Sequence, residues 1–177
     1  MLVENFRLMA RYNQWMNNNL YTCARHLDPT LLAKDQGAFF GSILGTLNHL
    51  LVADVIWMQR FALHPLPFAS LDYIRQYTPP VALNQIVHDD LASLRRDRNE
   101  VDLCLIAFCA ELSDPVLDTD LHYKDTKGNP YSNKLSELLL HLFNHQTHHR
   151  GQTTTLFSQS GVDAGVTDLL FLLRQGK

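Results

Sequence analysis

The sequence predicts an all-α fold, a four-helix bundle with a short β-hairpin before the last long helix and a short C-terminal helix. Apolar residues recur at three- and four-residue steps in four long segments, and prolines or turn residues separate these segments. A hydrophobic content of 46% with 19% charged residues is ordinary for a globular protein. The length fits one domain over residues 1–177. The four helical segments are residues 3–26, 43–63, 81–112 and 132–159.

The first helix is expected over residues 3–26, where Phe6, Met16 and Leu20 fall on one face. Residues 17–19 are all asparagine, which has only modest helix propensity, so packing of the apolar face must hold this stretch helical. Pro29 ends the helix, because the residue before a proline is biased away from helical conformation.

The second helix is expected over residues 43–63, after a packed connector at residues 30–41 and with Ser42 as its N-cap. Apolar residues on most of its sides predict heavy burial. The next connector, residues 64–80, contains four prolines and is too long for a tight turn. Because it can span the length of a bundle, the second and third helices are expected to run parallel.

The third helix is expected over residues 81–112, with its charged middle facing solvent. This middle, from Arg95 to Glu100, mixes both signs, which is typical of a solvated helix face. Pro115 follows shortly after and marks the end of the helix. The formal net charge is −3, and no segment concentrates Lys and Arg into a stripe, so no nucleic-acid partner is indicated.

The helical pattern stops over residues 116–131, where Gly128 suits the positive φ of a turn and a short β-hairpin is predicted. The fourth helix is expected over residues 132–159, with Ser132 or the following asparagine as its N-cap. A last short helix, capped by Thr167, is expected in the tail that ends the chain.

The fourth helix carries the most informative residues. His145 and His149 are four residues apart, on the stripe that also holds Leu138 and Leu142. One helix offers two imidazoles to a single metal ion at this spacing. His148 lies three residues from His145 and shares a face with it, but the stripe favours His149 as the ligand. His148 is then either a neighbour of the ligands or a solvent-facing residue.

A third ligand is expected from the second helix. His49 lies there among small or apolar residues, and a buried imidazole must satisfy both nitrogens by hydrogen bonds or by a metal. Three protein ligands with open positions are typical of a catalytic site. Histidines satisfied by hydrogen bonds alone are the alternative interpretation. It is adopted for His26, His64, His88, His122 and His141, of which His64 and His122 are expected to be exposed.

Asp54 lies on a mostly apolar stripe of the second helix, and a buried carboxylate needs a partner. Two interpretations stay open: it orients a metal-binding histidine, or it pairs with Arg60 or Arg150. Residues 146–148 contain no glutamate, so the pattern is not that of a zinc protease and no general base lies within the motif.

Residues 150–152 extend the same helical motif. Arg150 and Gln152 either bind a substrate anion or cross-link helices. Gly151 costs about 1 kcal/mol relative to alanine inside a helix. A close contact there, with another helix or with a ligand, would explain the glycine.

Cysteines and apolar runs bear on the cellular environment. Cys23, Cys104 and Cys109 are odd in number, lie in apolar surroundings and form no close pair, which predicts reduced, buried thiols. The N-terminus lacks the apolar core of a signal peptide, and no apolar run approaches the roughly 20 residues that span a bilayer. These features predict a cytoplasmic protein without a membrane partner.

Several segments of the chain, the histidine segment among them, resemble the motifs of a known protein family. The segment from Asn144 to Gln152, NHQTHHRGQ, is similar to the most specific motif of the DinB/YfiT-like family of metal-dependent enzymes, the damage-inducible DinB family. Residues 12–16, 45–61 and 167–170 resemble its other motifs, and the match covers nearly the whole chain.

The resemblance implies a bundle in up-down-down-up order and a divalent metal, zinc or nickel, on His49, His145 and His149. It also implies a homodimer. The wider superfamily contains thiol-dependent transferases, which implies a metal-dependent transferase or hydrolase with a small-molecule substrate and a low-molecular-weight thiol as second cofactor. It assigns no catalytic residue. The alternative is a non-enzymatic metal-binding protein that acts in a stress response or through an interaction partner.

Overall fold

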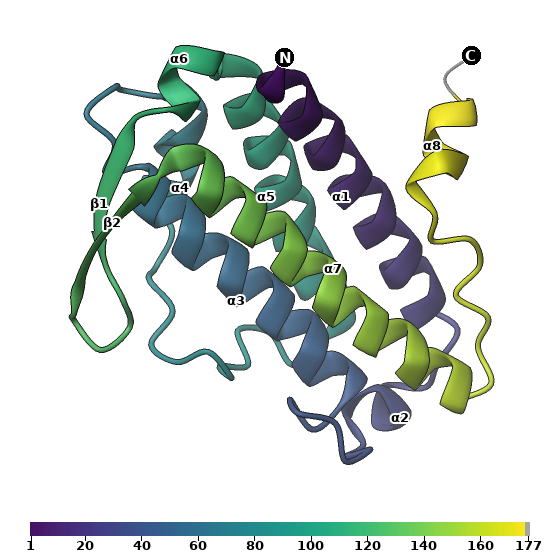
Figure 1. Cartoon of the computed structure of the whole chain (residues 1–177). Coiled ribbons are helices and arrows are strands. Elements are labelled where there is room, and N and C mark those ends of the chain that lie inside the picture. The colour runs from purple at the N-terminus through teal and green to yellow at the C-terminus, as the bar shows by residue number, and fades with distance from the viewer. Residues whose placement is uncertain (176–177) are drawn as a thin grey trace.

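The computed structural model describes residues 1–175 and confirms the helical bundle (Figure 1). Residues 176 and 177, the end of the predicted tail, lie outside the described residues. The helices α1 and α3 each pack against both α5 and α7, so their apolar stripes meet in one core. The four long helices are α1 (Leu2–Ala24), α3 (Ile43–Phe61), α5 (Leu91–Glu111) and α7 (Leu135–Gln159).

Shorter elements lie at the ends of the bundle. The predicted hairpin and C-terminal helix are both present (Figure 1). Among the described residues, no helix is both long enough and apolar enough to cross a membrane. The short elements are α2 (Pro29–Ala33), the 3₁₀ turn η1 (Ala69–Leu71), α4 (Asp72–Gln76), α6 (Asp114–Leu117), β1 (Asp120–Lys124), β2 (Pro130–Lys134) and α8 (Leu169–Gln175).

The direction of the helices follows from the connections. Helices α3 and α5 run parallel to each other, and α1 and α7 run in the opposite direction (Figure 1). The long connector between α3 and α5 returns the chain to the other end of the bundle, as its length predicts. This is the up-down-down-up order.

The start of α5 differs from the prediction. The helix begins at Leu91 rather than at residue 81. The Asn48 side chain explains the difference, because its oxygen accepts hydrogen bonds from the backbone N–H groups of Val87 (2.8 Å) and His88 (3.1 Å). These bonds keep the segment out of helical geometry. Asp90 then caps the helix by accepting a hydrogen bond from the Ser93 N–H, at 2.8 Å.

The hairpin shifts the start of α7. Strands β1 and β2 pair antiparallel, with Asp120 opposite Lys134, and Gly128 in the turn has a φ of 88°. Ser132 therefore lies in a strand, and the prediction that it or its neighbour caps the helix is wrong. The helix begins at Leu135, whose N–H donates to the Thr119 carbonyl oxygen at 2.9 Å.

Candidate metal centre

Three histidines from two helices converge at the interface of α3 and α7. The Nε2 atom of His145 lies 3.2 Å from Nε2 of His49 and 3.1 Å from Nε2 of His149. One nitrogen from each ring lies within 4.8 Å of the others. The structure thus brings together all three histidines that the sequence predicts as ligands.

The outer ring nitrogens determine where the lone pairs point. Nδ1 of His49 lies 2.8 Å from the Leu83 carbonyl oxygen, and Nδ1 of His149 lies 2.8 Å from Oε1 of Gln152. Both oxygens are acceptors, so each Nδ1 carries the proton and donates it. Each Nε2 therefore presents a lone pair toward His145. His145 Nε2 can hold one proton at most, so these nitrogens could hold a cation.

Burial keeps the three imidazoles neutral at physiological pH. It is the largest cause that lowers the pKa of His49 to about 4 and the pKa of His145 to about 3. The charge of a protonated His149 contributes to both lowered values as a smaller cause. Burial also lowers the pKa of His149. Neutral imidazole is the form that binds metal ions.

The spacing of the nitrogens fits a transition-metal ion. An ion that binds imidazole nitrogens at roughly 2.0–2.1 Å places neighbouring ligand atoms roughly 3.0 to 3.4 Å apart, depending on geometry. The two Nε2 separations of 3.1 and 3.2 Å lie in this range. The residues present are therefore compatible with a divalent metal ion.

Aromatic packing holds His49 in place. The Phe40 ring stacks on the His49 ring with 3.7 Å between centroids, and it meets His149 edge-on at 5.4 Å. Gly45 makes this possible, since a Cβ at its position would lie 2.1 Å from the Phe40 carbonyl oxygen. Sequence reasoning missed Phe40 and Leu83. Leu83 acts through its backbone, which leaves no side-chain signal, whereas a glycine four residues before a histidine ligand is a usable signal of close approach.

The histidines His148, His122 and His64 are not part of the triad. His148 is exposed, and its Nε2 accepts a hydrogen bond from Gln152 at 3.2 Å, so Gln152 bridges His148 and His149. Gln152 therefore does not cross-link helices among the described residues. His122 is exposed as predicted, but His64 is buried, which corrects the prediction. His64 donates to Thr119 Oγ1 at 2.8 Å, and it accepts from the Leu66 N–H at 3.1 Å.

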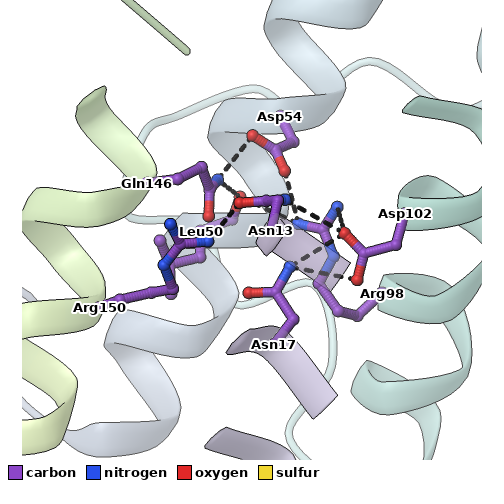
Figure 2. A network of polar contacts seen from close by, with 8 residues as sticks. All are labelled: Asn13, Asn17, Leu50, Asp54, Arg98, Asp102, Gln146 and Arg150. Carbon is purple, nitrogen blue, oxygen red and sulfur yellow. Dashed lines mark hydrogen bonds and ion pairs between the residues drawn. The ribbon is translucent and has the colours of Figure 1, made fainter. Parts of the chain in front are cut away.

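A buried polar network lies beside the triad and joins the four long helices (Figure 2). Asp54 pairs with Arg98 at 2.8 Å and accepts a hydrogen bond from Gln146 at 2.6 Å. Neither predicted role of Asp54 is correct, because its cationic partner is Arg98 and no histidine of the described residues hydrogen-bonds to it. The members are Asn13 and Asn17 from α1, Leu50 and Asp54 from α3, Arg98 and Asp102 from α5, and Gln146 and Arg150 from α7.

This network fixes the rotation of α7. Gln146 donates to the Leu50 carbonyl oxygen at 3.0 Å, and Arg150 donates to Asn13 on α1. Arg150 thus cross-links helices, which is one of its two predicted roles. Each of these residues directly follows a candidate ligand in sequence. Their buried contacts therefore orient His145 and His149 toward α3.

The charged middle of α5 is partly inside the bundle. Arg96 and Glu100 are exposed as predicted, but Arg98 is buried, which corrects the prediction of a solvated face. The signal was present in the sequence, because Leu94, Arg98, Val101 and Leu105 follow one another at steps of four, three and four. Asn17, the first residue of the asparagine run, is buried against Asp102 at 2.9 Å.

The cysteines offer no nucleophile to the site. All three are free, and Cys104 and Cys109 are buried as predicted, while Cys23 is only partly buried. Burial raises the pKa of Cys104 to about 11 and the pKa of Cys109 to about 12. Both therefore remain thiols at neutral pH.

The fold and the triad together define a helical-bundle protein with a three-histidine candidate metal site. The sequence profile of the DinB family matches residues 1–176, so the chain belongs to the DinB family. It is 24% identical over 162 residues to Protein DinB of Bacillus subtilis (strain 168), an alignment that covers 90% of this chain and 88% of that protein. No solved structure matches the chain.

Proposed function

We propose that this protein is a divalent-metal-dependent enzyme of the thiol-dependent transferase or hydrolase type, with His49, His145 and His149 as the metal ligands. One observation carries the proposal: the hydrogen bonds of Leu83 and Gln152 aim two imidazole lone pairs at His145 Nε2. Hydrogen-bonded imidazoles alone do not account for this, since one proton at most can be shared by the three nitrogens.

Three histidines leave coordination positions for a small molecule, which favours catalysis over a structural role for the ion. His145 is only partly buried, whereas Phe40 covers His49. A substrate would therefore approach from the His145 side. A divalent ion in this position supplies Lewis acidity and lowers the pKa of a water or thiol that reaches it.

The protein residues around the triad position the ligands rather than transfer protons. Leu83 and Gln152 hold the protons of the outer nitrogens, which fixes the orientation of the rings. Asp54 is engaged by Arg98 and Gln146 inside the network, so it is not available as a general base. The nucleophile in this proposal comes from solvent or from a low-molecular-weight thiol.

Elemental analysis of the purified protein tests the metal site. We expect one equivalent of zinc or nickel in the parent and in His148→Ala, and a loss of the metal in His49→Ala and His145→Ala. Full metal content in either ligand variant would contradict the proposal. All four proteins should show the same helical circular dichroism, so that a lost metal is not confused with lost folding.

Turnover distinguishes the proposed enzyme from a non-enzymatic metal-binding protein. The metal-loaded protein is incubated with an electrophile such as 1-chloro-2,4-dinitrobenzene, with and without a low-molecular-weight thiol, and with ester substrates. Thiol-dependent product supports the transferase, and thiol-independent ester cleavage supports the hydrolase. Metal binding with no reaction on either class would favour the non-enzymatic alternative.

A further inference from the structure

A pocket of about 680 Å³ lies away from the triad, between the end of α3 and the hairpin. The hairpin stands at the same end of the bundle as the last turn of α3 (Figure 1). Apolar and aromatic side chains, among them Leu63, Tyr123 and Tyr131, form much of its wall. Arg60 and Lys124 bring positive charge, and none of the described residues that line the pocket is acidic.

Arg60 is held by aromatic rings rather than by an acid. Its guanidinium carbon lies 4.4 Å from the centroid of Trp57 and 5.3 Å from the centroid of Tyr123. Within residues 1–175, no carboxylate lies within 4.0 Å of this guanidinium and no hydrogen-bond acceptor engages it. The side chain is half-buried, so its donors are partly removed from water without replacement.

The neighbouring charges leave Arg60 without a close ion-pair partner among the described residues, although Asp125 is near enough to raise the pKa of its guanidinium against the lowering by burial. The nearby Asp125 carboxylate is engaged in the hairpin turn, where it accepts from the backbone N–H groups of Lys127 (2.8 Å) and Asn129 (2.9 Å) and from the Asn129 side chain. Lys124 forms no ion pair among the described residues, so it adds to the positive potential. Arginine stays protonated at all physiological pH values.

We propose that this pocket binds a planar aromatic carboxylate, with the carboxylate on the Arg60 guanidinium and the ring against Leu63 and Tyr123. The guanidinium fork matches a carboxylate in bidentate geometry. The apolar wall favours an anion with an aromatic body over inorganic phosphate, which would leave that wall exposed to water.

Binding at this pocket does not depend on the metal. Arg60 follows His49 by eleven residues on the same helix. At 1.5 Å per residue, this separates their backbones by roughly 16 Å along the helix axis. A ligand of the size of benzoate on Arg60 therefore has no contact with the triad, and a test of this pocket succeeds or fails independently of the proposed function.

Tryptophan fluorescence provides the measurement. The chain has two tryptophans, Trp15 and Trp57, so the variant Trp15→Phe leaves Trp57, in contact with Arg60, as the sole reporter. In this background we expect saturable quenching by benzoate with a dissociation constant in the millimolar range. Benzamidine has the same shape and the opposite charge and should give none. Inorganic phosphate should give little.

Two substitutions of Arg60 and one control substitution, all in the Trp15→Phe background, test the role of Arg60. Arg60→Gln should weaken benzoate binding by roughly tenfold or more. Arg75→Gln is the matched control, because Arg75 lines an adjacent pocket but already pairs with Asp72, and it should bind benzoate like its parent. Arg60→Lys keeps the charge and loses the fork, so we expect an intermediate affinity even if the glutamine variant folds poorly.

Four results would overturn this inference. The first three are equal affinity of the parent and Arg60→Gln for benzoate, equal quenching by benzoate and benzamidine, and no saturable response of the parent to benzoate. Phosphate binding as strong as benzoate binding would also overturn it, because the aromatic wall would then contribute nothing.

Discussion

The guanidinium of Arg98, on α5, lies 2.8 Å from the carboxylate of Asp54, on α3, and each side chain is only 1% exposed. Arg98 also lies 3.0 Å from Asp102, one turn further along its own helix. Burial raises the pKa of both carboxyl groups, and the charge of Arg98 opposes this rise. One buried cation therefore holds two buried carboxyl groups at the centre of the bundle.

Removal of this cation should destabilise the fold severely. In Arg98→Met, Asp54 and Asp102 would lose their buried partner, and breaking such a pair costs about 3 to 5 kcal/mol. Arg96→Met is the matched control, since Arg96 is exposed on the same helix, and it should change the free energy of unfolding by less than about 0.5 kcal/mol. Urea unfolding of both variants measures the difference. Equal stability of the two would show that the network contributes nothing.

The bundle and the core-facing positions of the histidines follow from local periodicity, whereas the pairing of residues within the network does not. Apolar residues at helical spacing mark the face of each helix that becomes buried. The sequence therefore predicts four helices and places two histidines, His145 and His149, on a core-facing stripe. The identity of the partner of Asp54 depends on which helix packs opposite, and residues 54 and 98 are far apart in the chain. The start of α5 was missed for the same reason, because the Asn48 side chain holds residues 87 and 88 from another helix.

Gln152 should tune the affinity for metal without being a ligand. Its Oε1 accepts the Nδ1 proton of His149, so Gln152→Ala frees the ring to rotate and to change tautomer. We expect metal affinity to fall by about 10- to 100-fold in competition with a chromophoric chelator. His148→Ala removes only the outer partner of Gln152 and should bind metal like the parent. Unchanged affinity of Gln152→Ala would contradict the role of this hydrogen bond.

The metal-free protein should lose stability in acid. Folding lowers the pKa of His49 to about 4, below the value of about 6.5 in an unfolded chain, so the unfolded chain binds protons first as pH falls. The contribution of His49 to the free energy of unfolding is therefore fully present above pH 6.5 and is lost progressively toward pH 4. At pH 5 His49 alone should account for about 1 to 2 kcal/mol, with allowance for solvent screening.

Urea unfolding with a chelator present, at pH 7.5 and pH 5, checks this expectation. His49→Ala should show a smaller difference between the two pH values than the parent does. The exposed His122 offers a control, because His122→Ala should keep the difference found in the parent. If His49→Ala and His122→Ala lose equal stability on acidification, the burial of the His49 ring does not set its pKa.

Replacement of two helix glycines by alanine should change the stability of the protein in opposite directions. Gly45 lies in α3, where a Cβ would meet the Phe40 carbonyl oxygen at 2.1 Å, so Gly45→Ala must displace the segment that stacks on His49. Gly151 lies in α7, where such a Cβ would meet no atom of another described element within 4 Å, so the predicted contact with another helix is absent.

Gly151→Ala should therefore stabilise the protein by about 1 kcal/mol, because alanine loses less backbone entropy in a helix. Gly45→Ala should destabilise it and also weaken metal binding, since Phe40 would no longer hold the His49 ring. Thermal unfolding and metal competition on both variants separate these effects. Stabilisation by Gly45→Ala would show that the Phe40 segment moves without cost. Loss of stability in Gly151→Ala would instead indicate a contact at Gly151 with a bound ligand or another molecule.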